Sequence, residues 1–315
     1  PYCTASVVSS ALTVFDTNSK AVAWSLPIIG ALPVDVAVAP GRVGVAFAGL
    51  GNVLEYSATG VDAPRPGLGG CLYPVRVSPP GVPTGVGFVD GELQWFDETG
   101  VLHRPTPERD AQLVTLRELD PARELFHAQS PSGVACASCH PEGFEDGHVW
   151  QFGARRVRSQ TLEGGLLQTA PFHWDGRLRN LGAVLDDTFV LRMGGAEPDK
   201  TRVNELGAWL DTLKARAAAA PPDPLAVKKG RLLFTRSGCD SCHAGDAFTN
   251  GTTVDVGTGG AFQVPGLRAL RWRGPWMHDG CAQTLAQRFD PSCGGARHGT
   301  VAPGDVPNLV AFLET

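Results

Sequence analysis

The chain has 315 residues, of which 43% are hydrophobic, and a formal net charge of −5. This length allows more than one hydrophobic core, because single cores stop growing at roughly 250–300 residues. The acidic balance argues against a nucleic-acid partner, since phosphate binding needs a basic surface. No apolar run reaches the roughly 20 residues of a transmembrane helix, so we expect a protein that does not span a membrane. Because the chain opens at Pro1 without a signal-like segment, we expect a processed protein or a piece of a longer one.

Residues 1–108 have the pattern of an all-β region, with short alternating stretches rich in Val, Phe and Gly between turn signals. Three similar segments recur at residues 14–19, 55–60 and 95–100. A spacing of about 40 residues is typical of β-propeller blades. We therefore expect a propeller-blade-like region that forms the tail of a larger propeller. A small β domain that only imitates a propeller is the alternative.

From residue 109 onward, apolar residues recur at the spacing of helices. The pattern predicts helices over residues 108–129, with an interruption at Pro121, and over 204–220, 225–236 and 306–313. Gly230 and Phe234 lie one helical turn apart, where a small residue allows a second helix to cross closely. The prolines of residues 221–224 indicate a linker between two mainly α domains, residues 109–220 and 225–315.

Two copies of the motif Cys-x-x-Cys-His carry the strongest chemical signal: Cys136, Cys139 and His140, then Cys239, Cys242 and His243. In this motif the thiols attach haem covalently, and the histidine gives a proximal nitrogen to iron. We therefore expect two covalently bound haem c groups and two cytochrome c domains. A redox dithiol, or a zinc site that pools four thiolates, is the alternative. Two complete motifs far apart in the sequence disfavour it.

Four further cysteines are Cys3, Cys71, Cys281 and Cys293. Their even number allows two disulfides, and the shortest pairings are Cys281 with Cys293 and Cys3 with Cys71. Disulfides and covalent haem both indicate an oxidising compartment, so we expect a periplasmic or extracellular protein. Four buried free thiols are the alternative, because cysteine is often a small core residue.

The segments around the two motifs resemble the bacterial dihaem cytochrome c peroxidase and MauG superfamily over residues 122–315. The similar segments are residues 147–151, 171–177, 248–251, 264–268 and 275–280. The resemblance implies that one haem has an open or labile position that meets peroxide, while the other is six-coordinate and passes electrons. It also implies that Trp174 lies between the haems and shortens the path of the electron. A core aromatic residue is the alternative for Trp174.

The resemblance also raises the question of the sixth iron ligands. A MauG-type enzyme uses tyrosine on its second haem, but all tyrosines of this chain lie in the β region: Tyr2, Tyr56 and Tyr73. Among Met277, His278 and His298, we expect His298 to be the ligand, with Met277 as the second candidate. For the first haem, His148 matches the histidine that caps the resting haem in the peroxidases. A surface histidine is the alternative.

Peroxide cleavage requires a carboxylate that works as general acid and base. Where the family has its glutamate, residues 192–197 read Arg-Met-Gly-Gly-Ala-Glu, so the carboxylate is missing or displaced. Glu197 is the candidate, and Asp186 or Asp187 could substitute for it.

Two functions follow. The first is a periplasmic redox enzyme of the cytochrome c peroxidase and MauG type, which uses hydrogen peroxide to oxidise a donor or a partner protein. The second is a non-catalytic dihaem electron-transfer protein in which both haems are six-coordinate. Both need a redox partner protein, and they differ in whether one haem is open to peroxide.

Overall fold

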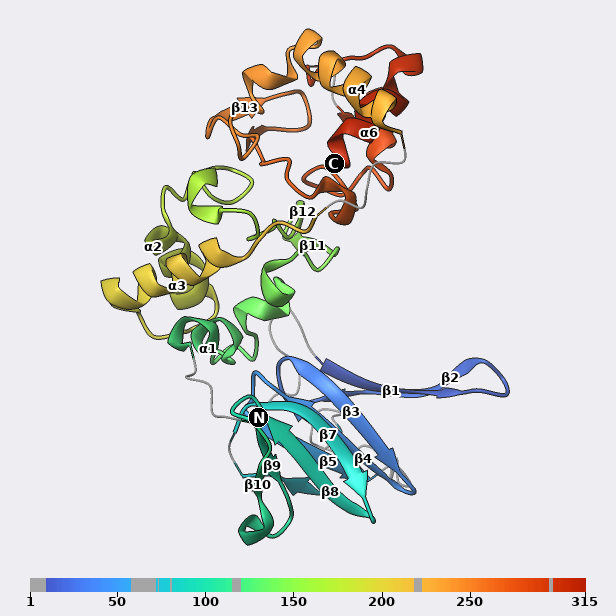
Figure 1. The fold of residues 1–315 in the computed structure, drawn as a ribbon, viewed down its shortest axis with the longest axis vertical. Helices are drawn as coiled ribbons and strands as arrows, with labels where there is room; N and C mark the ends of the chain where they lie inside the picture. The colour runs from blue at the N-terminus through green and yellow to red at the C-terminus, as the bar shows by residue number, and fades with distance from the viewer. Residues whose placement is uncertain are drawn as a thin grey trace. The chain divides into compact units, whose positions relative to one another are not determined.

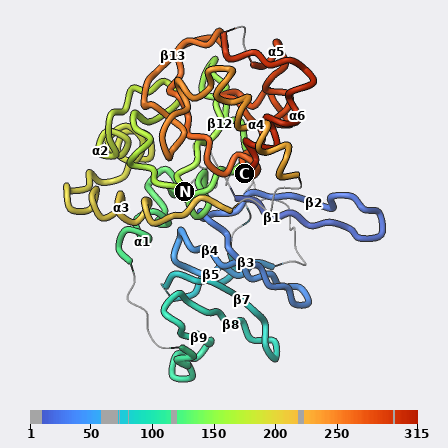
Figure 2. The backbone as a smooth tube through the Cα atoms, turned by 45° about the horizontal axis from the view of Figure 1, so that its top comes forward, coloured from blue at the N-terminus to red at the C-terminus, as the bar shows by residue number. Residues whose placement is uncertain are grey.

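The computed structural model describes residues 10–57, 72, 74–79, 81–114, 120–217, 223–294 and 297–315 (Figures 1 and 2). The chain divides into two compact units. Unit 1 contains Pro1–Ser138 and Thr188–Glu197, and unit 2 contains Cys139–Asp187 and Pro198–Thr315. The boundary therefore falls inside the first Cys-x-x-Cys-His motif. Cys3 and Cys71 lie outside the described residues, so their pairing stays a prediction.

In its described residues, unit 1 contains three antiparallel sheets. The first is the hairpin β1 (Ser10–Asp16) and β2 (Ala21–Ile28). The second has the order β3 (Pro33–Ala39), β4 (Arg42–Phe47), β5 (Asn52–Ser57) and β6 (Arg76–Val77). The third runs from β7 (Pro83–Val89) through β8 (Glu92–Asp97) and β9 (Val101–His103) to β10 (Ala111–Gln112). The all-β character predicted for this region is present.

The middle sheet of unit 1 is covered on both faces. Side chains on one face form a cluster with the first hairpin: Ile28, Val43, Val45, Phe47, Leu54 and Tyr56. On the other face, Ala46 and Val53 pack against Leu93 and Trp95 of the third sheet. Burial on both faces explains why β4 reads as a nearly continuous apolar run. Two stacked four-stranded sheets have the strand number of propeller blades, and the larger propeller stays a prediction.

The predicted 40-residue repeat does not follow the strand order. Residues 55–57 end the third strand of the middle sheet, whereas residues 95–97 end the second strand of the next sheet. The spacing misleads because a long connection separates β5 from β6, while β7, β8 and β9 follow one another through short turns. The recurring sequence therefore marks strand ends that meet turns, not equivalent strands.

The helix predicted over residues 108–129 is mostly wrong. Among the described residues of this range, α1 (Pro121–His127) is the one α-helix, with Asp120 Oδ1 accepting from the Ala122 N–H at 2.9 Å as its N-cap. Ahead of it, β10 pairs with β9, so the β-rich part continues past residue 108. His103 holds this corner, because its Nδ1 lies 2.8 Å from Asp110 Oδ2 and its Nε2 lies 2.8 Å from Asp97 Oδ2. These side-chain contacts override the apolar spacing.

Unit 2 contains most of the helices and two short hairpins. The helices are α2 (Leu181–Val184), α3 (Lys200–Thr212), α4 (Pro224–Arg236), α5 (Pro291–Gly294) and α6 (Val306–Leu313). A π-helical turn, η5 (Leu185–Arg192), follows α2. The predictions for α4 and α6 are confirmed, whereas α3 begins and ends earlier than predicted.

Helices α4 and α6 cross closely at Gly230, and Figure 1 shows them side by side. A Cβ atom on Gly230 would lie 2.0 Å from the carbonyl oxygen of Asn308 and 2.7 Å from the Cβ of Phe312. One turn later, the Phe234 and Phe312 rings meet edge to face at 5.4 Å. The close crossing predicted from Gly230 and Phe234 is therefore confirmed.

Unit 2 also contains an internal structural repeat. Its two hairpins are β11 (Val149–Phe152) with β12 (Arg155–Arg158), and β13 (Thr253–Asp255) with β14 (Ala261–Gln263). Each repeat has a later turn after its hairpin, around Trp174 in the first repeat and around His278 in the second. The end of each hairpin forms a hydrogen bond with the later turn of the other repeat. The Arg158 N–H donates to the His278 carbonyl at 2.9 Å, and the Gln263 N–H donates to the Trp174 carbonyl at 2.8 Å. This reciprocal pairing makes Trp174 and His278 equivalent positions at the centre of unit 2.

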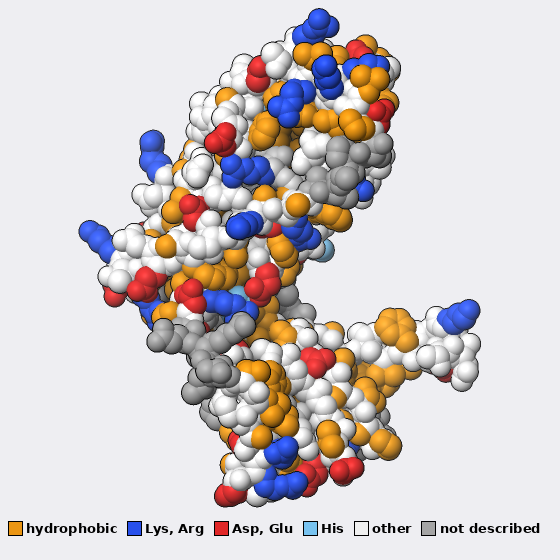
Figure 3. Space-filling view, viewed as in Figure 1, with side chains coloured by type: hydrophobic (Ala, Val, Ile, Leu, Met, Phe, Trp, Pro, Cys, Tyr) orange, Lys and Arg blue, Asp and Glu red, His pale blue; other side chains and the backbone are white. Residues whose placement is uncertain are grey.

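Unit 1 exposes several large apolar side chains. Phe15 on β1 is 63% exposed and Val38 on β3 is 74% exposed, and Figure 3 shows hydrophobic side chains along the projecting hairpin of β1 and β2. In the described part of the chain, no helix is long and apolar enough to cross a membrane.

Candidate haem-binding sites

The second Cys-x-x-Cys-His motif forms one tight turn directly after α4. Gly238, with φ of 71°, ends the helix and leads into η6 (Cys239–Ser241). The His243 N–H donates to the Cys239 carbonyl at 2.9 Å, which brings the histidine back over the cysteines. His243 Nδ1 lies 3.1 Å from the Phe248 carbonyl oxygen, so Nε2 is left for a metal. Burial lowers the pKa of His243, which favours the neutral imidazole that iron requires.

His298 lies opposite His243. Their ring centres are 6.3 Å apart and the ring planes differ by 31°. An imidazole nitrogen bonds a transition metal at about 2 Å and its ring centre lies roughly 1 Å further, so two opposed imidazoles on one metal have centres roughly 6 Å apart. Burial, together with the charges of Arg288 and His243, lowers the pKa of His298 to about 3. The donor set therefore fits a haem with two histidines, and the ligand role of His298 stays a prediction.

The first motif forms a similar turn, η2 (Cys136–Ser138), in which the Ala135 N–H donates to Ser138 Oγ at 3.0 Å. Burial lowers the pKa of His140, while the charges of Asp146 and Glu145 act in the opposite direction. His140 Nδ1 is buried without a hydrogen-bond partner in the described part of the chain. A neutral, buried imidazole next to two cysteines fits covalent haem. Within the described ranges, no aromatic or imidazole ring faces His140 as His298 faces His243.

Two of the other candidate ligands lie in turns. His148 is exposed, and its ring meets the edge of Trp150 at 4.3 Å. Met277 lies in the later turn of the second repeat with φ of 69°, and its carbonyl accepts from Arg158 Nε at 2.9 Å. Neither placement tests ligation, so both remain predictions.

The candidate carboxylates have different surroundings. Glu197 is exposed between η5 and α3. Asp187 Oδ1 lies 2.7 Å from Arg177 Nη2, and this ion pair raises the pKa of Arg177. Arg177 belongs to the Trp-Asp-Gly-Arg segment, so Asp187 is tied to the segment that contains Trp174. The acid–base role of either carboxylate stays a prediction. Among the described residues, no three His, Cys, Asp or Glu side chains cluster as a protein-only metal site would require.

Trp174 lies at the seam between the two repeats of unit 2. It is 8% exposed, and its indole N–H donates to the Arg158 carbonyl at 2.8 Å. Its ring meets His278 edge to face at 6.2 Å, and His278 stacks on Phe262 at 4.0 Å. The equivalent position of the two repeats thus carries an indole in one and an imidazole in the other.

A buried ion network, which no sequence pattern indicated, joins the two repeats at this seam. Glu145 pairs with Arg158 on one oxygen and with Arg273 Nε at 2.7 Å on the other, and all three side chains are at most 5% exposed. Arg158 also donates to the Arg273 carbonyl at 3.0 Å. No local pattern signals these contacts, because Glu145 and Arg273 are separated by 128 positions.

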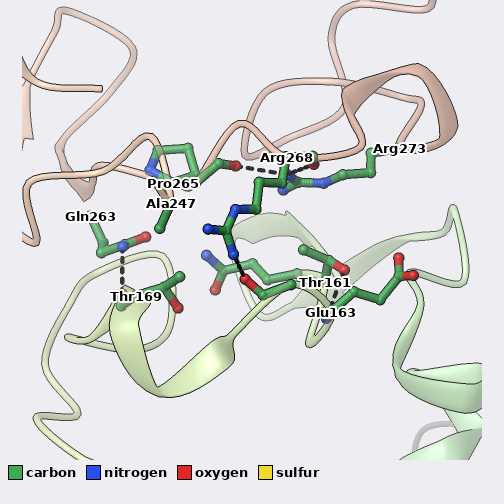
Figure 4. Close-up of a pocket in the computed structure, with 11 residues that line it drawn as sticks. Thr161, Glu163, Thr169, Ala247, Gln263, Pro265, Arg268 and Arg273 are labelled. Carbon is green, nitrogen blue, oxygen red and sulfur yellow. Dashed lines mark hydrogen bonds between the residues drawn. The ribbon is translucent and has the colours of Figure 1, made fainter. Parts of the chain in front are cut away.

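A polar cavity of about 40 Å³ lies between residues 160–164 and 263–268 (Figure 4). Arg268 and Arg273 line it from one side and Glu163 from the other, and burial raises the pKa of Glu163. Gln263 Nε2 donates across the seam to the Thr169 carbonyl at 3.0 Å. Ligand pockets usually enclose about 300–1,000 Å³, so this cavity suits water rather than an organic donor.

Comparisons with known proteins found distant relatives of this chain. Methylamine utilization protein MauG of Methylorubrum extorquens is 28% identical over 286 residues, covering 66% of this chain and 80% of MauG. Cytochrome c551 peroxidase of Pseudomonas aeruginosa is 23% identical over 299 residues (70% and 85%), and that of Nitrosomonas europaea is 25% identical over 298 residues (70% and 86%). The chain is a distant relative of these proteins.

Among solved structures, a chain of hydrazine synthase from Kuenenia stuttgartiensis, studied under xenon pressure, superposes with a TM-score of 0.53. The match has 21% sequence identity and covers 61% of this chain and 85% of that one. It shows a shared fold over this part of the molecule. No family model matches the chain.

Proposed function

We propose that this protein is a dihaem c-type cytochrome that works as a periplasmic redox enzyme of the peroxidase and MauG type. It would use hydrogen peroxide to oxidise a donor or a partner protein. The relatives named MauG and cytochrome c551 peroxidase support this class of activity. The two haems, when bound, would supply iron that exchanges electrons and, at the open position, reacts with peroxide.

The observation that carries the proposal is the difference between the two proximal histidines. His243 faces His298, whereas no ring in the described ranges faces His140. Ligation on both sides suits electron transfer, and an accessible side suits reaction with a small molecule. The first motif is therefore assigned to peroxide and the second to electron transfer.

The surrounding residues have separate roles in this proposal. Trp174 would connect the two sites, because it is buried at the seam and its orientation is held by Arg158. The ion network of Glu145, Arg158 and Arg273 would keep the two repeats at a constant separation. The stacked sheets of unit 1, with their exposed apolar side chains, offer a surface for a partner protein.

Electron paramagnetic resonance of the oxidised, haem-loaded chain tests the proposal. We expect one low-spin and one high-spin ferric signal of equal intensity, and we expect cyanide to abolish only the high-spin signal. Addition of peroxide should then change the spectrum within one turnover. Two low-spin signals that cyanide leaves unchanged would instead establish the non-catalytic electron-transfer protein.

A further inference from the structure

We infer that Arg288 is a positioning residue that holds His298 in its place opposite His243. This role rests on the proposed ligation of the second haem by His298.

The guanidinium of Arg288 binds two consecutive carbonyl groups of the His298 loop. Nη2 donates to the His298 carbonyl, and Nη1 donates to the Gly299 carbonyl at 3.3 Å. Two donors in one planar group fix both the distance and the orientation of this backbone. A Cβ atom on Gly299 would lie 3.9 Å from Cys239 Sγ. The bound loop therefore lies directly against the second haem motif.

Arg288 is itself held by its own segment. It lies in the short helical turn η8 (Leu285–Phe289), which begins with a capping box between Thr284 and Gln287. Its guanidinium lies 4.6 Å from the centre of the Phe289 ring. The disulfide between Cys281 and Cys293, with Cα atoms 5.6 Å apart, closes the loop that contains this turn. The segment that carries Arg288 is thus held by the capping box at its start and by the disulfide that closes the loop.

The charge of Arg288 has no acidic partner in the described part of the chain. Each ion pair found there involves another arginine or a histidine. The Arg288 guanidinium is a cation at neutral pH. A partly buried cation without a carboxylate depends on carbonyl oxygens for its solvation. Two of those oxygens are the carbonyls of His298 and Gly299. The same hydrogen bonds therefore solvate the Arg288 cation and hold the His298 loop.

The test uses the haem-loaded full chain and four variants. Arg288→Gln removes the charge and the paired donors of the guanidinium. Arg288→Lys keeps the charge but loses the two donors in one plane. Arg297→Gln is the matched control, because Arg297 is one residue from His298 but its side chain is 73% exposed and lies 4.0 Å from Asp255 Oδ2. His298→Gly removes the proposed ligand. The measurements are the low-spin fraction of the second haem and its affinity for cyanide.

We expect Arg288→Gln to convert part of the second haem to high spin and to tighten its cyanide binding about tenfold, since a hydrogen bond to a charged group contributes roughly the 1.4 kcal/mol that corresponds to a factor of ten. Arg288→Lys should give a smaller change in the same direction. Arg297→Gln should match the unmodified protein, and His298→Gly should convert the second haem completely. The signal of the first haem should not change in any variant.

Two outcomes would overturn the inference in distinguishable ways. If His298→Gly converts the second haem but Arg288→Gln does not, His298 is the ligand and Arg288 does not position it. If His298→Gly has no effect on the second haem, the proposed ligation fails and the role of Arg288 fails with it. Should Arg288→Gln not retain both haems, Arg288→Lys decides, and an unchanged cyanide affinity in that variant counts against the inference.

Discussion

At the scale of residues, Glu145 is the acidic member of the buried ion network in unit 2. It accepts from two buried guanidinium groups, so the cluster keeps a net positive charge away from water. Such a cluster is stable only while every member is paired, because an unpaired buried charge is strongly unfavourable. The network holds neighbouring groups in place, since Arg158 contacts both Trp174 and the later turn of the second repeat.

The first prediction concerns Glu145→Gln. The free energy of unfolding should fall by about 3–5 kcal/mol, because the substitution leaves a buried guanidinium without its counter-charge. Urea unfolding followed by circular dichroism measures this change. Arg155→Gln is the control, since Arg155 is 57% exposed and lies 3.5 Å from Asp175, and an exposed pair contributes at most about 1 kcal/mol. Equal losses in both variants would contradict the network.

The second prediction concerns Trp174→Phe. Phenylalanine keeps a ring at the seam but removes the N–H that donates to the Arg158 carbonyl. We expect a loss of about 1–2 kcal/mol in stability from the unsatisfied buried carbonyl. We also expect slower electron exchange between the haems, measured after flash reduction of one of them. Unchanged exchange with reduced stability would show that Trp174 is only a core residue.

At the scale of elements, the crossing of α4 and α6 depends on the absence of a side chain at Gly230. Gly230→Ala should destabilise unit 2 by roughly 1–3 kcal/mol, because its Cβ would overlap the Asn308 carbonyl and force the helices apart. Thermal unfolding measures the loss. Lys229→Ala, at the exposed neighbouring position of the same helix, should change stability by less than about 0.5 kcal/mol. A neutral Gly230→Ala variant would show that α6 is not packed against α4 at this point.

In unit 1, the pairing of β4 with β5 includes a charge pair whose effect depends on pH. Arg42 Nε donates to Glu55 Oε1 at 2.5 Å, and this hydrogen bond lowers the pKa of Glu55 below its ordinary value of 4.5. The pair therefore stabilises the folded state above the ordinary pKa, and this contribution is lost as the pH falls through the lower, folded-state pKa.

From about pH 6 to about pH 3, the free energy of unfolding of the unmodified protein should fall more than that of Glu55→Gln, by about 1.5–3 kcal/mol for a hydrogen bond to a charged group. Denaturant titrations at several pH values measure the two slopes. Parallel slopes would show that the pair of Arg42 and Glu55 does not contribute to stability.

At the scale of the whole molecule, the internal repeat of unit 2 places different side chains on two similar stretches of backbone. The backbone contacts between the repeats are reciprocal, whereas the side chains at the equivalent positions are Trp174 and His278. A shared backbone with different side chains allows one site to stay open while the other is closed. In the proposed function, this difference would let one haem meet peroxide while the other exchanges electrons.

The number of haems is tested on the intact chain. We expect the mass of the protein to exceed that of the polypeptide by two haem groups, because both motifs are complete and burial lowers the pKa of both proximal histidines. Replacing Cys136 and Cys139 together by alanine should remove one haem mass and leave the second haem spectrum intact. A mass increase of a single haem in the unmodified protein would contradict the dihaem proposal.

Local sequence determined several features of this protein. Each Cys-x-x-Cys-His motif fixes three residues within five consecutive positions, and each begins with a short helical turn. The predicted disulfide between Cys281 and Cys293 is present in the structure. It could be predicted because a short separation along the chain makes this loop easy to close. The bounds of α6 and the close approach at Gly230 also followed from helical spacing, which depends only on neighbours along the chain.

Only the tertiary structure decided the contacts that join distant segments. Three contacts connect residues far apart in the sequence: the position of His298 opposite His243, the pairing of Glu145 with Arg273, and the hydrogen bond from the Arg158 N–H to the His278 carbonyl. The apolar spacing of residues 108–129 predicted a long helix, yet strand pairing and the contacts of His103 determined the outcome there. Periodicity reports which face of an element is buried, whereas packing decides which other element covers that face.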